Sequence, residues 1–350
     1  MPDTLPMRPG RACPGRGDGT APPPVLVLDL DAALTSQPCL AGLLREGRAI
    51  HIEARDLAPR LRIVAARAPL ARLRERLHAL AGTENVPGTI AFYGSGDFHH
   101  LATLFLARLR EEVTLLHFDN HPDWVRFPAT VNCGAWVNRA LELPQVARVV
   151  TIGPAGDDLV RPQWKGANLR ALREGRLEVH AWRGRESRYR GRPFEAPGCR
   201  AGHGRIAWDS LADASWEGFL DALDARLPGR PLWVSLDKDV LGPGEALSNW
   251  EQGGMTLSAI LQAVERLGHR RGILGIDICG DYSPPRFRDP FRWLLSATDR
   301  AAVPRPSEAA LAVNDRSNRR ILEAFGALPG TAPPFSFPSE RHSAARDHAA

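Results

Sequence analysis

Lysine is nearly missing from this chain of 350 residues, because arginine supplies all of its basic side chains except Lys165 and Lys238. The arginines alternate with acidic residues, as in segment 72–76, so the net charge of +5 is not gathered into one basic stripe. A nucleic-acid-binding surface would show such a stripe, often interleaved with aromatic residues. We therefore expect no nucleic-acid partner.

Long hydrophobic runs are missing as well. No apolar run approaches the roughly 20 residues that span a bilayer, and residues 1–24 contain no apolar segment of the kind that a secretory signal needs. The five cysteines are scattered and lack Cys-x-x-Cys spacing. That pattern argues against a disulfide framework or a thiolate zinc site and suits a reducing compartment. We expect a cytoplasmic protein with no membrane partner.

Short apolar runs alternate along the chain with segments in which apolar residues recur every three or four positions. The runs predict strands, several of them covered on both faces, and the periodic segments predict helices. Their alternation is typical of the α/β class, in which a mostly parallel sheet carries helices on both sides. The predicted strands are 25–30, 50–53, 62–66, 89–93, 113–118, 148–152, 177–181, 232–236 and 273–278. The predicted helices are 69–80, 100–112, 134–143, 216–227 and 256–267.

The two ends of the chain differ in composition from its centre. Residues 1–24 and 329–350 are rich in proline and small residues, so we expect flexible tails around one domain, residues 25–328. Within that domain, segment 183–204 is rich in Arg, Gly and Pro and is expected to be a long surface excursion.

Candidate chemistry follows three of the predicted strands. Strand 113–118 runs directly into Asp119, His121 and Asp123, and strand 232–236 runs into Asp237 and Asp239. Strand 89–93 leads into the glycine-containing segment 94–100, which ends in two histidines. Ligands of parallel α/β sheets bind beyond the carboxyl ends of the strands, so these side chains should share one cleft.

Carboxylates gathered in one cleft need positive charge, since like charges raise one another's pKa. A pair of divalent cations supplies it, and ligand sets of carboxylate and imidazole favour Mn²⁺, Fe²⁺ or Zn²⁺. Each motif alone has a plainer interpretation: Asp-x-Asp after a strand is often a cap, and histidines at a helix start often lie on the surface. The conjunction of the three is what favours a metal centre.

These motifs resemble those of the arginase/agmatinase (ureohydrolase) superfamily. That family carries a Gly-Gly-Asp-His-Ser turn, an Asp-Ala-His-x-Asp string and a Ser-x-Asp-x-Asp-x-x-Asp-Pro string, in this order. Segments 119–123 and 235–243 are similar to the second and third strings, and Gly253–Thr256 is similar to the family's Gly-Gly-Leu-Thr. The first string is degenerate and aligns the family's histidine with His99 and its serine with His100. The resemblance covers most of residues 25–325.

The resemblance implies a three-layer α/β/α domain with a mostly parallel, roughly eight-stranded sheet and two metal ions, usually Mn²⁺. Asp119 and Asp237 would bridge the ions, and a hydroxide between the metals would attack a trigonal carbon. The residues completing the two ions would be His99 with Asp123 and His121 with Asp239. Asp123 would also pass a proton to the leaving amine. Family members are often trimers or hexamers, so a homo-oligomer is a further possible partner.

The substrate-binding residues depart from the family's pattern. Cys133, after Asn132, stands where many relatives have a histidine, and Gly280 stands where the family has its guanidinium-binding glutamate. Asp281, one residue further, is the replacement that we consider for that glutamate. Trp250 and Glu251 follow the third motif in a loop that should overhang the site.

Two further residues of these motifs have candidate roles. Trp124 is another pocket candidate. Lys238 should turn away from its two aspartate neighbours, and we expect a structural salt bridge with a buried carboxylate such as Asp29, Asp31 or Asp277, with substrate contact as the alternative.

Three functions remain open from the sequence. The first is a hydrolase of a small guanidino or amidino compound, cleaving a C–N bond. The second is a metal-dependent amidohydrolase or deacetylase on the same fold, which the missing glutamate favours. The third is a non-catalytic metal-binding protein.

Overall fold

Strands that are apolar on consecutive residues form the centre of the molecule. The computed structural model describes residues 22–82, 87–126, 131–284, 289–290, 292 and 306–337. Its main sheet has eight strands, all parallel, in the order β2-β1-β4-β14-β13-β5-β7-β8. The strands are β1 (Val25–Asp29), β2 (Ala49–Glu53), β4 (Thr89–Phe92), β5 (Val113–Phe118), β7 (Val146–Ile152), β8 (Leu177–His180), β13 (Leu232–Asp237) and β14 (Ile273–Cys279).

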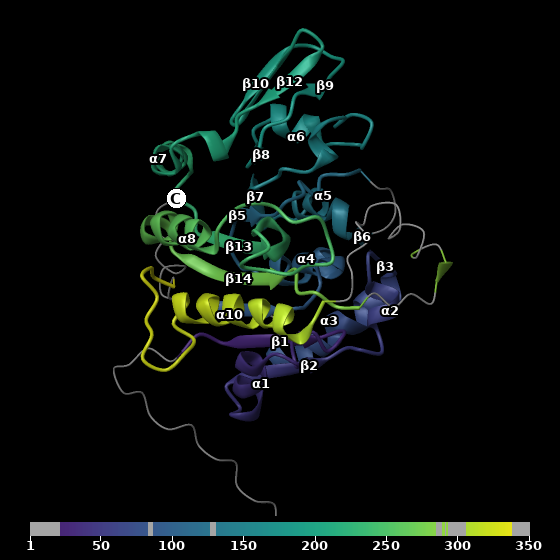
Figure 1. The fold of residues 1–350 in the computed structure, drawn as a ribbon, viewed down its shortest axis with the longest axis vertical. Helices are drawn as coiled ribbons and strands as arrows, with labels where there is room; N and C mark the ends of the chain where they lie inside the picture. Colours follow the sequence, from purple (N-terminus) through teal and green to yellow (C-terminus); the bar gives the residue numbers. More distant parts are fainter. Residues whose placement is uncertain are drawn as a thin grey trace, which may run out of the picture.

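Helices cover both faces of this sheet (Figure 1). Alternate residues of β1 show the two sides, because Val25 and Val27 pack into one apolar cluster while Leu26 and Leu28 pack into another. The first cluster includes residues of α1 (Pro38–Arg45), α7 (Trp216–Arg226), α8 (Leu257–Arg271) and α10 (Glu308–Ala324). The second includes residues of α3 (Arg67–Ala81), α4 (Ala102–Leu106), α5 (Trp136–Ala140) and α6 (Leu169–Arg173). The predicted three-layer α/β/α class is confirmed.

Eight of the nine predicted strands lie in the main sheet, and segment 62–66 does not. There the short helix α2 (Ala58–Leu61) is followed by Ile63 with a φ of 64°, a left-handed conformation that interrupts an extended strand. The remaining β3 (Val64–Ala65) pairs antiparallel with β6 (Val131–Asn132) in a separate two-stranded sheet.

One predicted helix has the wrong bounds, and two helices were missed. Segment 100–112 is a 3₁₀ helix η1 (Gly96–Leu101) followed by the short α4, so the predicted helix ends much too late. Helices α1 and α10 were not predicted, although α10 begins at a serine cap, where Ser307 Oγ accepts from the Ala310 N–H.

The surface excursion at 183–204 is an ordered element. Its strands form a four-stranded antiparallel sheet that extends away from the main sheet beyond β8 (Figure 1). They are β9 (Ser187–Arg188), β10 (Phe194–Ala196), β11 (Cys199–Gly202) and β12 (Arg205–Trp208).

The C-terminal tail was predicted to begin too early. Phe335 is buried against Phe325, and the Ile273 N–H donates to Ser336 O at 3.1 Å, so residues up to 337 pack on the domain. The rest of that tail and residues 1–21 lie outside the described residues.

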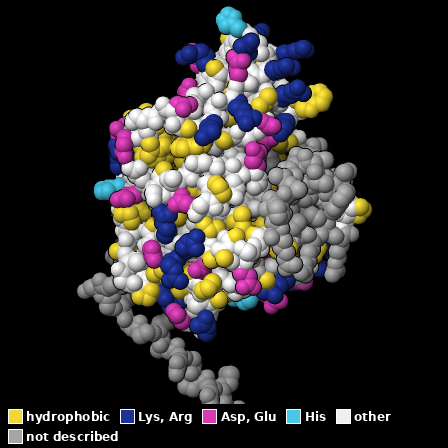
Figure 2. All heavy atoms as spheres, in the orientation of Figure 1, with side chains coloured by type: hydrophobic (Ala, Val, Ile, Leu, Met, Phe, Trp, Pro, Cys, Tyr) yellow, Lys and Arg dark blue, Asp and Glu magenta, His cyan; other side chains and the backbone are white. Residues whose placement is uncertain are grey.

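Charged side chains of both signs are interspersed over the face in Figure 2, with basic ones prominent over the small antiparallel sheet. Several of those arginines face acidic partners, including Arg200 with Glu195 and Arg205 with Glu186. Among the described helices, none combines the length and the apolar character that crossing a membrane requires.

Candidate metal centre

The centre of the sheet places its chemistry at the carboxyl ends of four neighbouring strands, β4, β14, β13 and β5. After β4 the chain enters η1, whose first turn is capped by Ser95 Oγ accepting from the Asp97 N–H at 3.2 Å. Gly96 must lack a side chain, since a Cβ there would lie 2.5 Å from Asp237 Oδ2 and 3.2 Å from the Trp250 ring. This close approach brings His99, one turn further, against the ends of the other strands.

The loop after β5 carries three candidate ligands. Asp119 Oδ1 accepts the His121 N–H at 2.7 Å, and Asp123 Oδ2 accepts the Trp136 Nε1–H at 2.6 Å. The spacing of the three residues suggested an extended backbone that points all three side chains to one side. The backbone is not extended there, because Asp123 has a φ of 44°. A left-handed residue at this position is strained, and such strain is common at functional sites.

Asp237 at the end of β13 has two roles that the sequence presented as alternatives. Its Oδ1 accepts the Asp239 N–H at 3.0 Å and so caps the 3₁₀ helix η5 (Lys238–Val240). Its Oδ2 lies 3.5 Å from His99 Nδ1. The same side chain is therefore both a cap and a member of the cluster.

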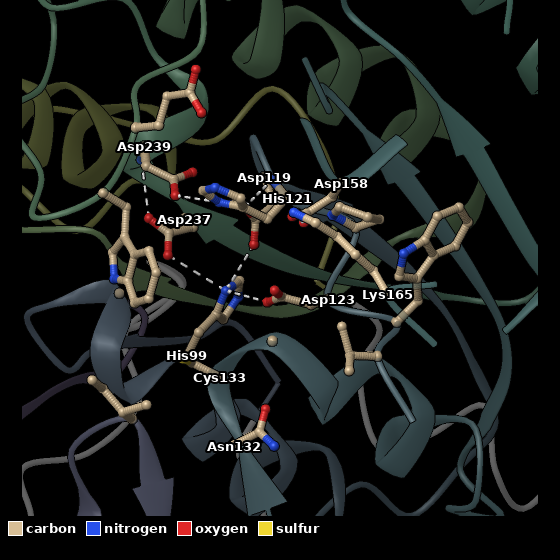
Figure 3. A pocket seen from close by; sticks show the side chains of 18 of the residues that line it. His99, Asp119, His121, Asp123, Asn132, Cys133, Asp158, Lys165, Asp237 and Asp239 are labelled. Atoms are coloured by element: carbon tan, nitrogen blue, oxygen red, sulfur yellow. Dashed lines mark hydrogen bonds and ion pairs between the residues drawn. The ribbon is translucent and has the colours of Figure 1, made fainter. Parts of the chain in front are cut away.

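The six predicted metal ligands converge in one place (Figure 3). His99 Nδ1 lies 3.0 Å from Asp119 Oδ2, 3.3 Å from Asp123 Oδ2 and 3.5 Å from Asp237 Oδ2. His121 Nδ1 lies 3.0 Å from Asp239 Oδ2 and 3.5 Å from Asp119 Oδ1.

His99 Nδ1 is fully enclosed and makes no hydrogen bond among the described residues, despite these short distances. A buried nitrogen that faces three carboxylate oxygens without a proper hydrogen bond suits a cation at their centre. The donor set of carboxylates and imidazoles therefore fits divalent metal ions.

Without the positive charge of a cation, burial and mutual repulsion disfavour the ionised forms of most of these carboxylates. Burial and the negative charge of Asp119 raise the pKa of Asp123 to about 8. Burial, together with its carboxylate neighbours, also raises the pKa of Asp237 and, more strongly, that of Asp239. Burial acts in the same direction on Asp119, but its hydrogen bonds with His117 and His121 hold its pKa well below the usual range. Metal ions bound among these side chains would supply the positive charge that stabilises the ionised carboxylates.

The second ring nitrogen of His99, Nε2, contacts a chain of buried polar side chains. His99 Nε2 lies 3.0 Å from Ser235 Oγ, which in turn donates to Asp277 Oδ1 at 2.7 Å. Asp277 also accepts from Tyr93 and Trp233. Such a chain fixes the ring's orientation and tautomer, as outer partners of metal-bound histidines do.

Sequence reasoning missed two further groups of the cluster. His117 Nε2 lies 3.0 Å from Asp119 Oδ2, and Cys279 Sγ donates to Asp237 Oδ2 at 3.3 Å. A ligand atom of His117 lies within 4.8 Å of ligand atoms of His99, Asp119 and Asp123. The Cys279 sulfur lies within 4.8 Å of ligand atoms of His99 and Asp237. A signal existed for each: His117 lies near the end of β5, two residues before Asp119, and Cys279 ends β14, two residues after Asp277.

The rival histidine, His100, is also buried, but it does not line the cavity in the described residues. Neither of its ring nitrogens has a hydrogen-bond partner there, and burial lowers its pKa to about 3. Of the two histidines, His99 is the one that the fold directs at the carboxylates.

A cavity of about 420 Å³ opens over the cluster. Four of the five predicted substrate-binding residues line it, namely Asn132, Cys133, Trp250 and Glu251, and Trp124 lines it as well. Ile63 and Val64 join Cys133 and Trp250 in an apolar wall. The opposite rim carries the ion pair of Asp158 with Lys165, whose Nζ lies 2.6 Å from Oδ1.

The fifth residue, Asp281, is placed elsewhere. It is fully buried, is not among the described residues that line the cavity, and accepts from Lys238 Nζ at 2.7 Å. The structure thus corrects two expectations. Asp281 is not positioned to contact a substrate in the cavity, and the carboxylate partner of Lys238 is Asp281 instead of Asp29, Asp31 or Asp277.

Comparisons with known proteins come from sequence and from structure. No family model matches the chain. An uncharacterised protein of Thermotoga maritima is 26% identical over 199 residues. The matched residues make up 57% of this chain and 60% of that relative's length.

Several solved structures are similar to the chain over most of its length. Proclavaminate amidino hydrolase from Streptomyces clavuligerus has 13% identity and a TM-score of 0.46, with 85% of this chain and 92% of that chain covered. Arginase from Bacillus caldovelox has 15% identity and a TM-score of 0.47, covering 85% and 97%. Formimidoylglutamase from Bacillus subtilis has 12% identity and a TM-score of 0.42, covering 88% and 90%. At values of this size, the activity has to be argued from the chain's own residues.

Proposed function

We propose that the protein is a divergent member of the arginase/agmatinase superfamily and a binuclear metal-dependent hydrolase, cleaving a C–N bond of a small guanidino or amidino compound. One observation carries the proposal: His99 Nδ1, buried and without a hydrogen bond among the described residues, lies within 3.5 Å of oxygens of three different aspartates. The motif order along the chain supports the same assignment.

Two divalent ions, Mn²⁺ by the family resemblance, would share the cluster. Asp119 lies beside both imidazoles, and Asp237 lies beside His99. By the family resemblance, both aspartates would be shared by the two ions. His99 and Asp123 would complete one ion, and His121 and Asp239 the other. When bound, the ions supply the positive charge that lowers the pKa of water and stabilises negative charge developing at a trigonal carbon.

Asp123 is the residue best placed to move a proton. Asp123 lines the cavity, and its Oδ2 is oriented by the Trp136 Nε1–H, so it is placed to exchange a proton with a water bound there. In the proposed reaction it accepts a proton from the attacking water and delivers it to the leaving amine. The cavity of about 420 Å³ suits a small-molecule substrate, and its apolar wall would hold the part that does not react.

A second candidate function is favoured by Gly280. The resemblance aligns this residue with the guanidinium-binding glutamate, but its φ is 92° and an added Cβ would lie 2.3 Å from Asp237 Oδ1. Without a carboxylate there, the paired hydrogen bonds that a guanidinium requires are not supplied from this position. An amide substrate, cleaved by an amidohydrolase or deacetylase with the same metal centre, does not need them.

The decisive test separates metal binding from substrate choice. The protein is stripped of metal, reloaded with Mn²⁺, and assayed for urea and ammonia release from a panel of guanidino and amidino compounds. Acetate release from acylated amines is measured in parallel. Two equivalents of bound metal with urea or ammonia release support the proposal, whereas acetate release alone favours the second candidate.

Two variants give the test its controls. Asp119→Ala removes the shared ligand and is expected to lose both ions together with activity. Asp56→Asn removes an exposed carboxylate that is paired with Arg76 and should leave both unchanged. A wild-type protein that binds fewer than two ions at saturation would contradict a binuclear site.

A further inference from the structure

The last strand of the sheet adds a thiol to the cluster. We propose that Cys279 is a metal ligand, so that one of the two positions is a mixed nitrogen, oxygen and sulfur site that prefers Zn²⁺ to Mn²⁺. This inference rests on the proposed metal centre and names the ion that this chain selects.

The fold places Cys279 beside Asp237, one of the proposed metal ligands. It pairs with Asp237 across the neighbouring strands, and its side chain is fully buried; among the described residues it is not one that lines the cavity. Cys279 Sγ lies 3.3 Å from Asp237 Oδ2, the oxygen that is also 3.5 Å from His99 Nδ1. Ligand atoms of His99, Asp237 and Cys279 all lie within 4.8 Å of one another.

These separations match those of ligands around one ion. Metal–ligand distances of about 2.0–2.3 Å at tetrahedral angles separate the ligand atoms by roughly 3.3–3.8 Å. The sulfur–oxygen distance of 3.3 Å and the nitrogen–oxygen distance of 3.5 Å agree with this range.

A second and independent observation is the unsatisfied nitrogen of His99. His99 Nδ1 is buried, has no hydrogen bond among the described residues, and is directed at the same carboxylate oxygen as the thiol. Gly280 keeps the adjoining space open, because any side chain there would meet Asp237. Nitrogen, oxygen and sulfur therefore face one point from three separate elements.

The sulfur changes which metal is favoured. Carboxylate oxygens suit Mn²⁺, whereas thiolate is a soft ligand that favours Zn²⁺. On binding, the Cys279 thiol releases its proton to solvent and the sulfur forms the bond to the ion. The scattered cysteines had argued against a thiolate zinc site; a single thiolate among aspartates and a histidine needs no Cys-x-x-Cys spacing.

Cobalt spectroscopy tests the ligand directly. The full-length protein is stripped of metal and titrated with Co²⁺, because cobalt bound by thiolate shows an intense near-ultraviolet charge-transfer band that nitrogen and oxygen ligands do not give. We expect this band in the wild type, its loss in Cys279→Ser and its retention in Cys199→Ser, which alters a buried thiol in the small sheet. Serine retains a hydroxyl donor for Asp237, and circular dichroism checks that each variant is folded.

Metal competition gives a second readout. Cys279→Ser should weaken Zn²⁺ binding by about tenfold or more while changing Mn²⁺ binding by less than about threefold. Bound Co²⁺ with visible d–d bands but no charge-transfer band in the wild type, or a band that survives in Cys279→Ser, overturns the sulfur ligand and leaves the metal centre standing. Failure of the folded wild type to bind Co²⁺, Zn²⁺ or Mn²⁺ overturns both proposals.

Discussion

Lys238 Nζ lies 2.7 Å from Asp281 Oδ1, and both side chains are fully buried behind the candidate metal ligands. Asp281 Oδ1 also accepts from Gln37 Nε2 at 2.7 Å, and Lys238 donates to Asn318 Oδ1 at 2.9 Å. The pair therefore ties the turn between Asp237 and Asp239 to α1 and α10.

Removing the lysine should destabilise the fold strongly. Lys238→Met leaves Asp281 as an uncompensated buried charge, which costs about 3–5 kcal/mol of unfolding free energy. Denaturant unfolding measures this, with Lys165→Met as the control, since an exposed ion pair is worth about 1 kcal/mol or less. The double change Lys238→Met with Asp281→Leu should recover much of the loss. A Lys238→Met effect as small as that of the control would contradict a structural role for the pair.

The bond behind His99 should matter more to metal affinity than to folding. Ser235→Ala frees the imidazole to rotate and should weaken metal binding by about 10–100-fold. Isothermal titration with the metal alone measures this effect. Ser258→Ala, on the exposed face of α8, removes a hydroxyl that accepts from Arg320 and should leave metal affinity unchanged. Equal affinities for wild type and Ser235→Ala would show that Ser235 does not orient the ligand.

Gly280 should tolerate no side chain. Gly280→Ala sets a Cβ 2.3 Å from Asp237 Oδ1 and 2.4 Å from Lys238 N, on a backbone with a φ of 92°. Crowding of this kind costs about 1–3 kcal/mol, and the displaced Asp237 should bind metal more weakly. Gly242→Ala is the matched control, because an added Cβ there has no neighbour within 4 Å. Thermal unfolding and metal titration together check the contrast, and two variants that behave alike would refute it.

The metal-free protein should lose stability as pH rises. Asp123 has its pKa raised from 3.8 to about 8 in the fold, so between these values the folded state holds a proton that the unfolded state has released. The stabilisation is complete below about pH 4 and is lost as pH rises through 8.

Denaturant unfolding of the metal-free protein at a series of pH values from 5 to 8.5 checks this dependence. Asp123→Asn should flatten the slope, because it removes one titrating group. The metal-loaded protein should show the opposite trend, since metal binding competes with protons and strengthens as pH rises. His100 and His117, whose pKa values burial lowers, act in the opposite direction in both proteins, so the comparison is between the two slopes. A slope for Asp123→Asn equal to that of the wild type would contradict the shifted pKa of Asp123.

Much of the fold was predictable because its signals are local. The strand at 113–118 is apolar on consecutive residues, and its bounds agree with those of β5. The prediction of a strand at 62–66 was wrong because the left-handed conformation of Ile63 cannot be inferred from an apolar run. The small sheet at β9–β12 was missed because its strands are only two to four residues long, too short for their alternation of buried and exposed residues to stand out in an Arg- and Gly-rich segment.

The candidate site likewise has a part that local sequence position predicts and a part that depends on contacts between distant segments. Position after a strand is enough to predict that Asp119, His121 and Asp237 meet at one edge of a parallel sheet. Contacts between distant segments are not encoded by any local pattern. His99 and Ser235 are 136 residues apart, and Lys238 and Asp281 are 43 residues apart, yet each pair is joined by a buried polar contact.

The sequence by itself determined the layered α/β class and the cluster of carboxylates and histidines, because both depend on spacing along single strands. Only the tertiary structure decided that His99 and not His100 faces the cluster, that Asp281 pairs with Lys238 instead of lining the cavity, and that Cys279 lies against Asp237. The physical reason is that these choices depend on a left-handed turn, a close approach at Gly96 and Gly280, and the register of β13 with β14, which are fixed only when the strands pack side by side.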